Sequence, residues 1–123
     1  TGVVASMACD PPEVPDHIKL HKGWFKDTLP EWCKTNTGKI SFLHMDADIY
    51  SSTREVLFQL DKQIKPGTVI VFDEFSNFRL SGKMSNWQDH EYKALCEWIE
   101  ECSRVVQPLN RNWAYQATCV VVS

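Results

Sequence analysis

Carboxylates that follow two apolar segments are the residues best suited to chemistry in this chain. Asp46 follows the apolar segment 39–45, and the pair Asp73 and Glu74 follows 68–72. If the two segments are neighbouring parallel strands, Asp46 and Asp73 meet at the carboxyl edge of a sheet, where open α/β sheets bind ligands. Adjacent carboxylates repel each other, and a hard cation such as Mg²⁺ removes that repulsion by taking oxygen ligands. Asp46 and Asp73 are therefore candidate metal ligands, unless these acids only cap helices and form turns.

Asp48 completes an Asp-x-Asp motif, which several chemistries share. Haloacid-dehalogenase-type phosphatases use the first Asp as nucleophile and the second as acid/base. They usually carry Thr or Val two residues later, where this sequence has Tyr50. Glycosyltransferases use the motif to hold Mn²⁺ and a nucleotide-sugar diphosphate. On the motif alone, a phosphatase and a glycosyltransferase both stay open.

The hydrophobic pattern around these acids predicts alternating strands and helices. The predicted strands are residues 18–22, 39–45, 68–72, 104–109 and 114–123. The predicted helices are residues 27–36, 51–64 and 91–102. A polar turn at 110–112 joins the last two strands, and residues 1–17 form an irregular lead-in segment. This order predicts an α/β fold in which parallel strands with crossover helices end in an antiparallel hairpin.

Two of the predicted helices carry an apolar face at helical spacing, which predicts that these faces pack into the core. The first face consists of Val56, Leu57, Leu60 and Ile64. The second consists of Tyr92, Leu95, Trp98 and Ile99.

Composition limits the class of protein. The chain has 123 residues, of which 43% are hydrophobic and 24% charged, as expected for a single globular domain. A net charge of −3 without a basic cluster argues against a nucleic-acid partner, and no apolar run approaches the roughly 20 residues of a membrane helix. The five cysteines are odd in number and form no Cys-x-x-Cys pair, which favours a reduced, cytoplasmic protein.

Several stretches together form a more specific pattern. They are Gly23 to Pro30 (GWFKDTLP), His44 to Thr53 (HMDADIYSST), Lys65 to Phe75 (KPGTVIVFDEF), Trp87, and Glu91 to Ala94 (EYKA). In this order and spacing the chain resembles the macrocin O-methyltransferase family (the TylF/MycF type) of class I S-adenosylmethionine-dependent methyltransferases. The resemblance covers roughly residues 18–123 and implies a Rossmann-like class I methyltransferase sheet.

The resemblance also implies site residues. It implies that Asp46, Asp73 and Glu74 bind Mg²⁺, although the family often has Asp where Glu74 stands. It implies that Asp27 and Thr28 contact the adenosine part of S-adenosylmethionine, with Asp46 near the sulfonium side. The implied reaction is methyl transfer to a hydroxyl of a sugar or another small-molecule acceptor.

Three aromatic or basic side chains are further candidates. His44 precedes Asp46 by two residues on the same strand, so both side chains point to one face, and His44 is a candidate catalytic residue. In the family, the loop that contains Trp87 and Phe78 borders the acceptor pocket, which implies an aromatic wall there.

Part of the family pattern has no counterpart in this sequence. Residues 1–17 contain one glycine and no Gly-x-Gly turn for the cofactor, which predicts the C-terminal portion of a methyltransferase domain. The strand 39–45 would then lie at an open edge, so we expect a longer protein or a homodimer formed through that edge. The alternative function is a non-catalytic remnant or interaction module that lacks the cofactor half-site.

Overall fold

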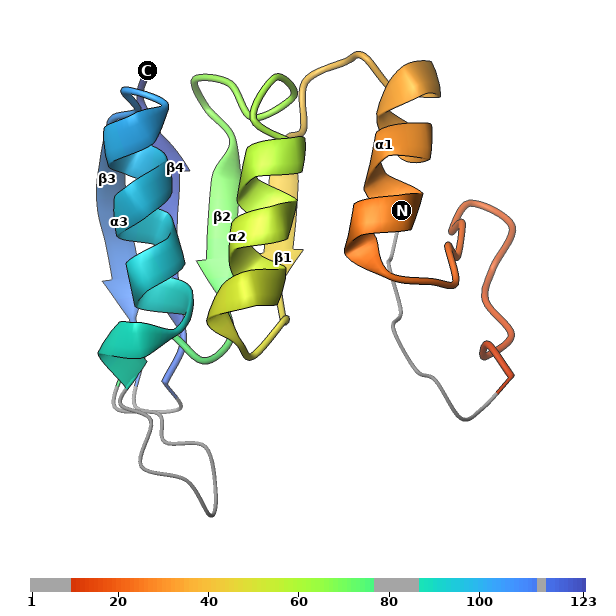
Figure 1. Ribbon diagram of the computed structural model, residues 1–123, viewed down its shortest axis with the longest axis horizontal. Helices are drawn as coiled ribbons and strands as arrows, with labels where there is room; N and C mark the ends of the chain where they lie inside the picture. Colours follow the sequence, from red (N-terminus) through yellow and green to blue (C-terminus); the bar gives the residue numbers. More distant parts are fainter. Residues whose placement is uncertain (1–9, 77–86, 113–114) are drawn as a thin grey trace. The chain divides into compact units, whose positions relative to one another are not determined.

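The computed structural model describes residues 10–76, 87–112 and 115–123 (Figure 1). The chain divides into two compact units, residues 1–36 and residues 37–123. All four described strands belong to the second unit, which therefore contains the described sheet.

One helix dominates the described part of the first unit. Helix α1 spans Phe25–Thr35, which confirms the predicted helix with a start two residues earlier. The carbonyl of Trp24 accepts hydrogen bonds from the backbone N–H groups of Asp27 and Thr28, and this fixes the first turn. The predicted strand 18–22 is wrong, because Leu20 forms only an isolated bridge and a strand needs a repeating ladder of hydrogen bonds.

The second unit is built on a four-stranded sheet in the order β1-β2-β4-β3. Its strands are β1 Phe42–Met45, β2 Val69–Phe72, β3 Val106–Arg111 and β4 Ala117–Val121. Strand β1 runs parallel to β2, and β4 runs antiparallel to both of its neighbours, β2 and β3. The predicted parallel strands with a closing antiparallel hairpin are confirmed.

The hairpin turn lies later than the sequence pattern predicts. Strand β3 continues to Arg111, so the predicted turn at 110–112 is wrong. The register shifts between Pro108 and Asn110, which leaves Leu109 as an extra residue between two paired positions. This β-bulge allows pairing to continue through the polar residues that resemble a turn in the sequence.

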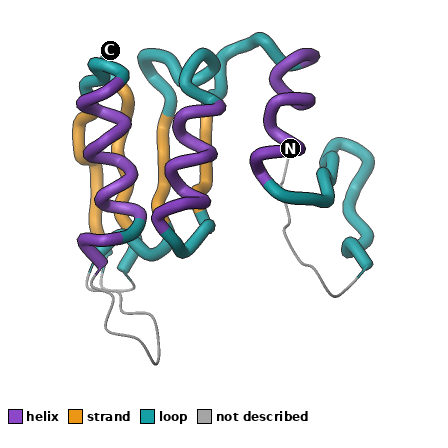
Figure 2. The backbone as a smooth tube through the Cα atoms, in the orientation of Figure 1, coloured by secondary structure: helices purple, strands orange, loops and turns teal. Residues whose placement is uncertain are grey.

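Two helices lie on one face of the sheet (Figures 1 and 2). They are α2, Tyr50–Gln59, and α3, Glu91–Glu101, which follows the short 3₁₀ helix η1, Trp87–Asp89. All four residues of the predicted apolar face of α2 are buried, although the regular helix ends at Gln59 and turns carry the chain onward. Tyr92 was predicted to lie in the core but is 38% exposed, so α3 packs through Ala94, Leu95 and Trp98.

Strand register assigns side chains to the two faces of the sheet. Leu43, Ile70 and Cys119 occupy paired positions and lie on one face, where Ile70 and Cys119 are buried. Phe42 lies on the opposite face of β1 and is 61% exposed. Because β1 is an end strand of this sheet, an exposed aromatic residue lies next to a sheet edge.

A hydrogen-bond network holds the beginning of α2 against α3. The hydroxyl of Tyr50 donates to Glu97 Oε2 at 2.6 Å, and Arg54 Nε donates to the same oxygen at 3.2 Å. Arg54 also reaches both carboxylate oxygens of Glu101 at 3.2 Å. These contacts position the start of α2, and with it the loop that follows β1.

Thr68 connects the beginnings of the two parallel strands, and its replacement gives a first prediction. Its buried hydroxyl donates to the carbonyl of Ile40 at 2.5 Å and accepts from the N–H of Lys65 at 3.0 Å. Thr68→Val keeps the shape but leaves both backbone groups unpaired, so the free energy of unfolding should fall by about 1–3 kcal/mol. Urea unfolding followed by tryptophan fluorescence measures this loss. The half-buried Thr118 serves as control, and an equal loss in Thr118→Val would contradict the role of Thr68.

Candidate functional site

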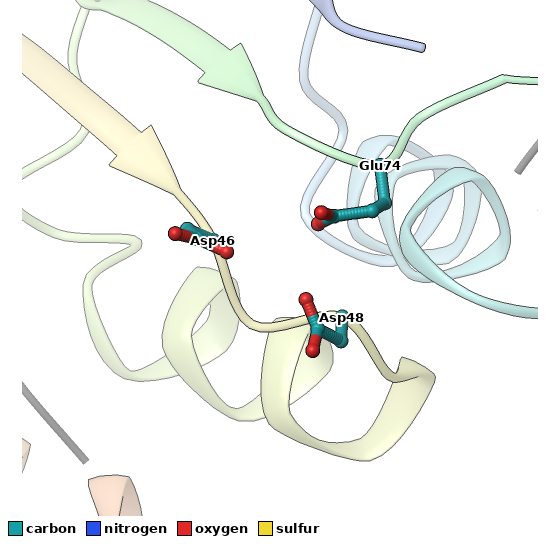
Figure 3. Close-up of side chains that lie close together, drawn as sticks. All are labelled: Asp46, Asp48 and Glu74. Atoms are coloured by element: carbon teal, nitrogen blue, oxygen red, sulfur yellow. The ribbon is translucent and has the colours of Figure 1, made fainter. Parts of the chain in front are cut away.

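Three carboxylates converge at the carboxyl ends of β1 and β2. Asp46 and Asp48 lie in the loop after β1, and Glu74 lies in the turn after β2 (Figure 3). One oxygen from each of the three lies within 4.8 Å of the others. The parallel register pairs Met45 with Phe72, so the residues after these two positions must emerge side by side. Those residues are Asp46 and Asp73, and the turn after β2 brings Glu74, one residue further, into a carboxylate cluster with Asp46 and Asp48.

The backbone conformation of Asp48 places its side chain in the cluster. Asp48 has a φ of 60°, in the left-handed region that few residues with a Cβ adopt. The N–H of Ile49 donates to the carbonyl of Ala47 at 2.6 Å, which closes a γ-turn centred on Asp48. Backbone strain of this kind persists where the surrounding structure demands it, often at functional sites.

The strain at Asp48 gives a second prediction. Asp48→Ala and Asp48→Gly remove the same carboxylate, but only glycine relaxes at a positive φ. The glycine variant should therefore exceed the alanine variant in free energy of unfolding by about 1 kcal/mol. Thermal unfolding of the two variants side by side measures the difference. An alanine variant as stable as the glycine variant would show that the γ-turn carries no strain.

The charge state of Glu74 depends on its neighbours. The pKa of Glu74 is raised to about 8, mainly by burial and then by a hydrogen bond with Asp48 and by the negative charge of Asp48. Glu74 Oε2 is buried without a hydrogen-bond partner among the residues that the structure describes. A protonated Glu74 relieves the repulsion in the cluster, and a divalent cation would do the same in place of that proton. The all-oxygen donor set therefore fits Mg²⁺.

Asp73 makes its hydrogen bonds to other side chains. Its Oδ1 accepts from Gln116 Nε2 at 2.6 Å and lies 3.3 Å from His44 Nε2. These contacts, that of Gln116 foremost, lower the pKa of Asp73. Both hydrogen bonds use Oδ1, so a metal-binding role for the other oxygen, Oδ2, stays a prediction. Sequence reasoning missed Gln116, which lies directly before β4, the strand that pairs with β2.

The residues predicted to contact the cofactor lie in different units. Asp27 and Thr28 stand in the first turn of α1, within residues 1–36, whereas Asp46 belongs to residues 37–123. The hydroxyl of Thr28 donates to the carbonyl of Trp24 at 3.0 Å. The contacts of Asp27 and Thr28 with a cofactor therefore stay predictions.

A row of aromatic side chains begins next to the carboxylate cluster. The ring of Phe75, the residue after Glu74, lies 5.6 Å from the ring of Tyr92. Tyr92 in turn lies 5.2 Å from Trp87 in an edge-to-face arrangement. Trp87 was a predicted wall residue, and Phe78, the other one, lies outside the described residues.

Two solved structures of one methyltransferase, CalS11, have a similar fold. The apo structure of CalS11, described as a TDP-rhamnose 3'-O-methyltransferase of calicheamicin biosynthesis, matches 82% of this chain and 40% of its own, with a TM-score of 0.61. Sequence identity is 22%. A second CalS11 structure matches with a TM-score of 0.60. The described sheet is therefore part of a Rossmann-like methyltransferase fold.

The sequence assigns the family. A model of the family described as macrocin O-methyltransferase (TylF) matches residues 14–102, and this chain belongs to that family. No helix in the described part of the chain is long and apolar enough to cross a membrane.

Two curated relatives are similar over about half of the chain. The 8-demethyl-8-(2,3-dimethoxy-alpha-L-rhamnosyl)-tetracenomycin-C 4'-O-methyltransferase of Streptomyces olivaceus is 34% identical over 61 residues, 50% of this chain. The mycinamicin III 3''-O-methyltransferase of Micromonospora griseorubida is 32% identical over 60 residues, 49% of this chain. The chain spans 22% of the length of each relative.

Proposed function

We propose that this chain is part of a metal-dependent, S-adenosylmethionine-dependent O-methyltransferase that acts on a hydroxyl of a sugar or another small molecule. Family membership and the printed activities of the relatives support the methyl transfer. The convergence of Asp46, Asp48 and Glu74 is the observation that carries the metal dependence. Asp46 and Glu74 are the proposed ligands, with Asp48 as the third and Asp73 as a further one.

His44 is the proposed base for the acceptor hydroxyl. Its ring lies at the carboxyl end of β1, two residues before Asp46, and is exposed to an incoming acceptor. The hydrogen bond from Nε2 to Asp73 would orient the ring. S-adenosylmethionine supplies an electrophilic methyl group, and bound Mg²⁺ would orient the acceptor oxygens. The carboxylate of Asp46 would favour the positive sulfonium, and Asp27 and Thr28 would contact the adenosine.

The aromatic row supports a sugar or other small-molecule acceptor. The row begins at Phe75, the residue after the proposed ligand Glu74, and continues through Tyr92 to Trp87. Apolar faces of a sugar ring pack well on such side chains, and pockets for small molecules combine aromatic walls with a few polar groups. The printed acceptors of the proteins named above are a rhamnosyl-tetracenomycin C, mycinamicin III and, for CalS11, TDP-rhamnose.

Calorimetric titration tests this proposal. The chain is titrated with S-adenosylhomocysteine and with Mg²⁺, separately and together, and Asp46→Asn serves as the variant without one ligand. Binding of Mg²⁺ by the wild type, weakened in Asp46→Asn, supports the metal site. Binding of S-adenosylhomocysteine supports the cofactor site within this chain. If neither binds, this chain does not hold the two sites by itself, and the alternative of a non-catalytic remnant is favoured.

A homodimer through the edge of β1 is a second proposal about this chain. The end position of β1 and the exposed ring of Phe42 favour it, because such edges pair readily with another chain. Light scattering after gel filtration should show a dimer for the wild type and a monomer for Phe42→Lys. A monomeric wild type at all concentrations would overturn the proposal.

A further inference from the structure

A buried acid at the start of α3 contacts both loops of the carboxylate cluster. Glu91 is the first residue of α3 and has an exposed fraction of 0%. Its Oε2 accepts a hydrogen bond from the backbone N–H of Glu74 at 3.1 Å. The backbone of Ala47, which stands between Asp46 and Asp48, also lies close enough to the Glu91 carboxylate to lower its pKa. One side chain thus reaches the loop after β1 and the turn after β2.

The burial of Glu91 is costly, so its contacts need an explanation. Burial raises the pKa of Glu91 to about 7, and the backbone groups of Glu74 and Ala47 oppose that rise. The other oxygen, Oε1, is buried without a hydrogen-bond partner among the described residues. An apolar side chain of the same size would avoid this desolvation cost. The position of Glu91 in the first turn of α3 stabilises a negative charge there, but only modestly.

Beyond the ends of their strands, the two loops share few backbone hydrogen bonds among the described residues. The bond from the N–H of Asp73 to the carbonyl of Met45, at 2.9 Å, extends the β1–β2 ladder by one step. Past that step, Asp48 lies in a γ-turn and Glu74 in a non-helical turn. The Glu91 side chain, which accepts from Glu74 and lies near the Ala47 backbone, spans this irregular region.

We propose that Glu91 is a positioning residue, which holds the loops after β1 and β2 together through their backbone amides so that the carboxylates of Asp46, Asp48 and Glu74 converge. The effect of Glu91 on Mg²⁺ binding rests on the proposed function, whereas the connection between the loops does not. Glu91 acts through the backbone and is not itself a ligand.

The test compares two replacements of similar length. Glu91→Met fills the space but accepts no hydrogen bond, and Glu91→Gln keeps a carbonyl that can accept from Glu74. Amide hydrogen exchange by NMR follows the Ala47 and Glu74 N–H groups in metal-free protein. Calorimetry measures the affinity for Mg²⁺ alone. Glu100→Gln, at an exposed position of the same helix, is the matched control.

We expect Glu91→Met to accelerate exchange at Glu74 at least about tenfold and to weaken Mg²⁺ binding about 10–100-fold. Glu91→Gln should restore protection at Glu74 and most of the affinity. Unchanged exchange in Glu91→Met would overturn the positioning role. An affinity loss in Glu91→Gln as large as in Glu91→Met would indicate that Glu91 itself binds Mg²⁺, and this result would also overturn the positioning role. If the wild type binds no Mg²⁺, the metal proposal fails, and the exchange rates still decide the role of Glu91.

Discussion

Trp98→Ala is expected to lower the free energy of unfolding by about 3–5 kcal/mol. Among the described residues, Trp98 is the largest fully buried side chain, with an exposed fraction of 0%, and it lies in the second half of α3. Its Nε1 donates to Asp61 Oδ1 at 2.9 Å, and the same oxygen accepts from Arg104 Nε at 2.9 Å. The alanine variant therefore leaves a cavity and also removes one donor from a half-buried carboxylate.

Urea unfolding monitored by circular dichroism measures this effect without depending on tryptophan fluorescence. Leu109→Ala, at a position in β3 that is 54% exposed, serves as control and should change stability by less than about 1 kcal/mol. A loss below about 1 kcal/mol in Trp98→Ala would mean that α3 contributes little to the core. Such a result would contradict the packing described above.

Glu74→Gln is expected to flatten the dependence of stability on pH in metal-free protein. The pKa of Glu74 is raised from its ordinary 4.5 to about 8 by burial and by Asp48. Between these two values the folded state keeps a proton that the unfolded state has released, so stability falls as the pH rises. Glutamine is neutral in both states and removes that contribution.

Unfolding midpoints in urea, measured from pH 5 to pH 8, test this prediction. The variant should lose about half of the slope in this window, because the pKa of Glu91 is also raised, to about 7, and Glu91 remains in place. Glu100→Gln removes an exposed acid from α3 and should keep the slope of the wild type. An unchanged slope in Glu74→Gln would show that Glu74 is ionised throughout the window.

Local sequence patterns were sufficient to predict much of this fold. Apolar runs that follow Gly and precede acidic residues mark β1 and β2. Helical spacing marks the buried face of α2, because burial on one side of an element leaves a periodic pattern. The predicted strand at 18–22 was wrong because these residues lack a ladder of hydrogen bonds. The predicted burial of Tyr92 was wrong because helical spacing does not show where the covered surface of a helix ends.

The site was predictable only in part. Asp46 and Asp73 directly follow two paired strand ends, so parallel pairing predicts that they emerge side by side, whereas the approach of Glu74 to Asp46 depends on the turn after β2. The position of Asp48 in the carboxylate cluster depends on a γ-turn that no sequence pattern predicts. Gln116 and Glu91 reach the site from the hairpin and from α3, and such long-range contacts leave no periodic signal.

The position of β4 between β2 and β3 has a consequence for the order of folding during synthesis. Both neighbours of β4 precede it in the chain, so β2 and β3 emerge from the ribosome before the strand that joins them. Until residues 117–121 are available, β2 lacks its partner on that side, and the nascent chain exposes a strand edge rich in valine and isoleucine. Folding that waits for such distant contacts is slow, and chaperones that shield strand edges would act on the chain at this stage.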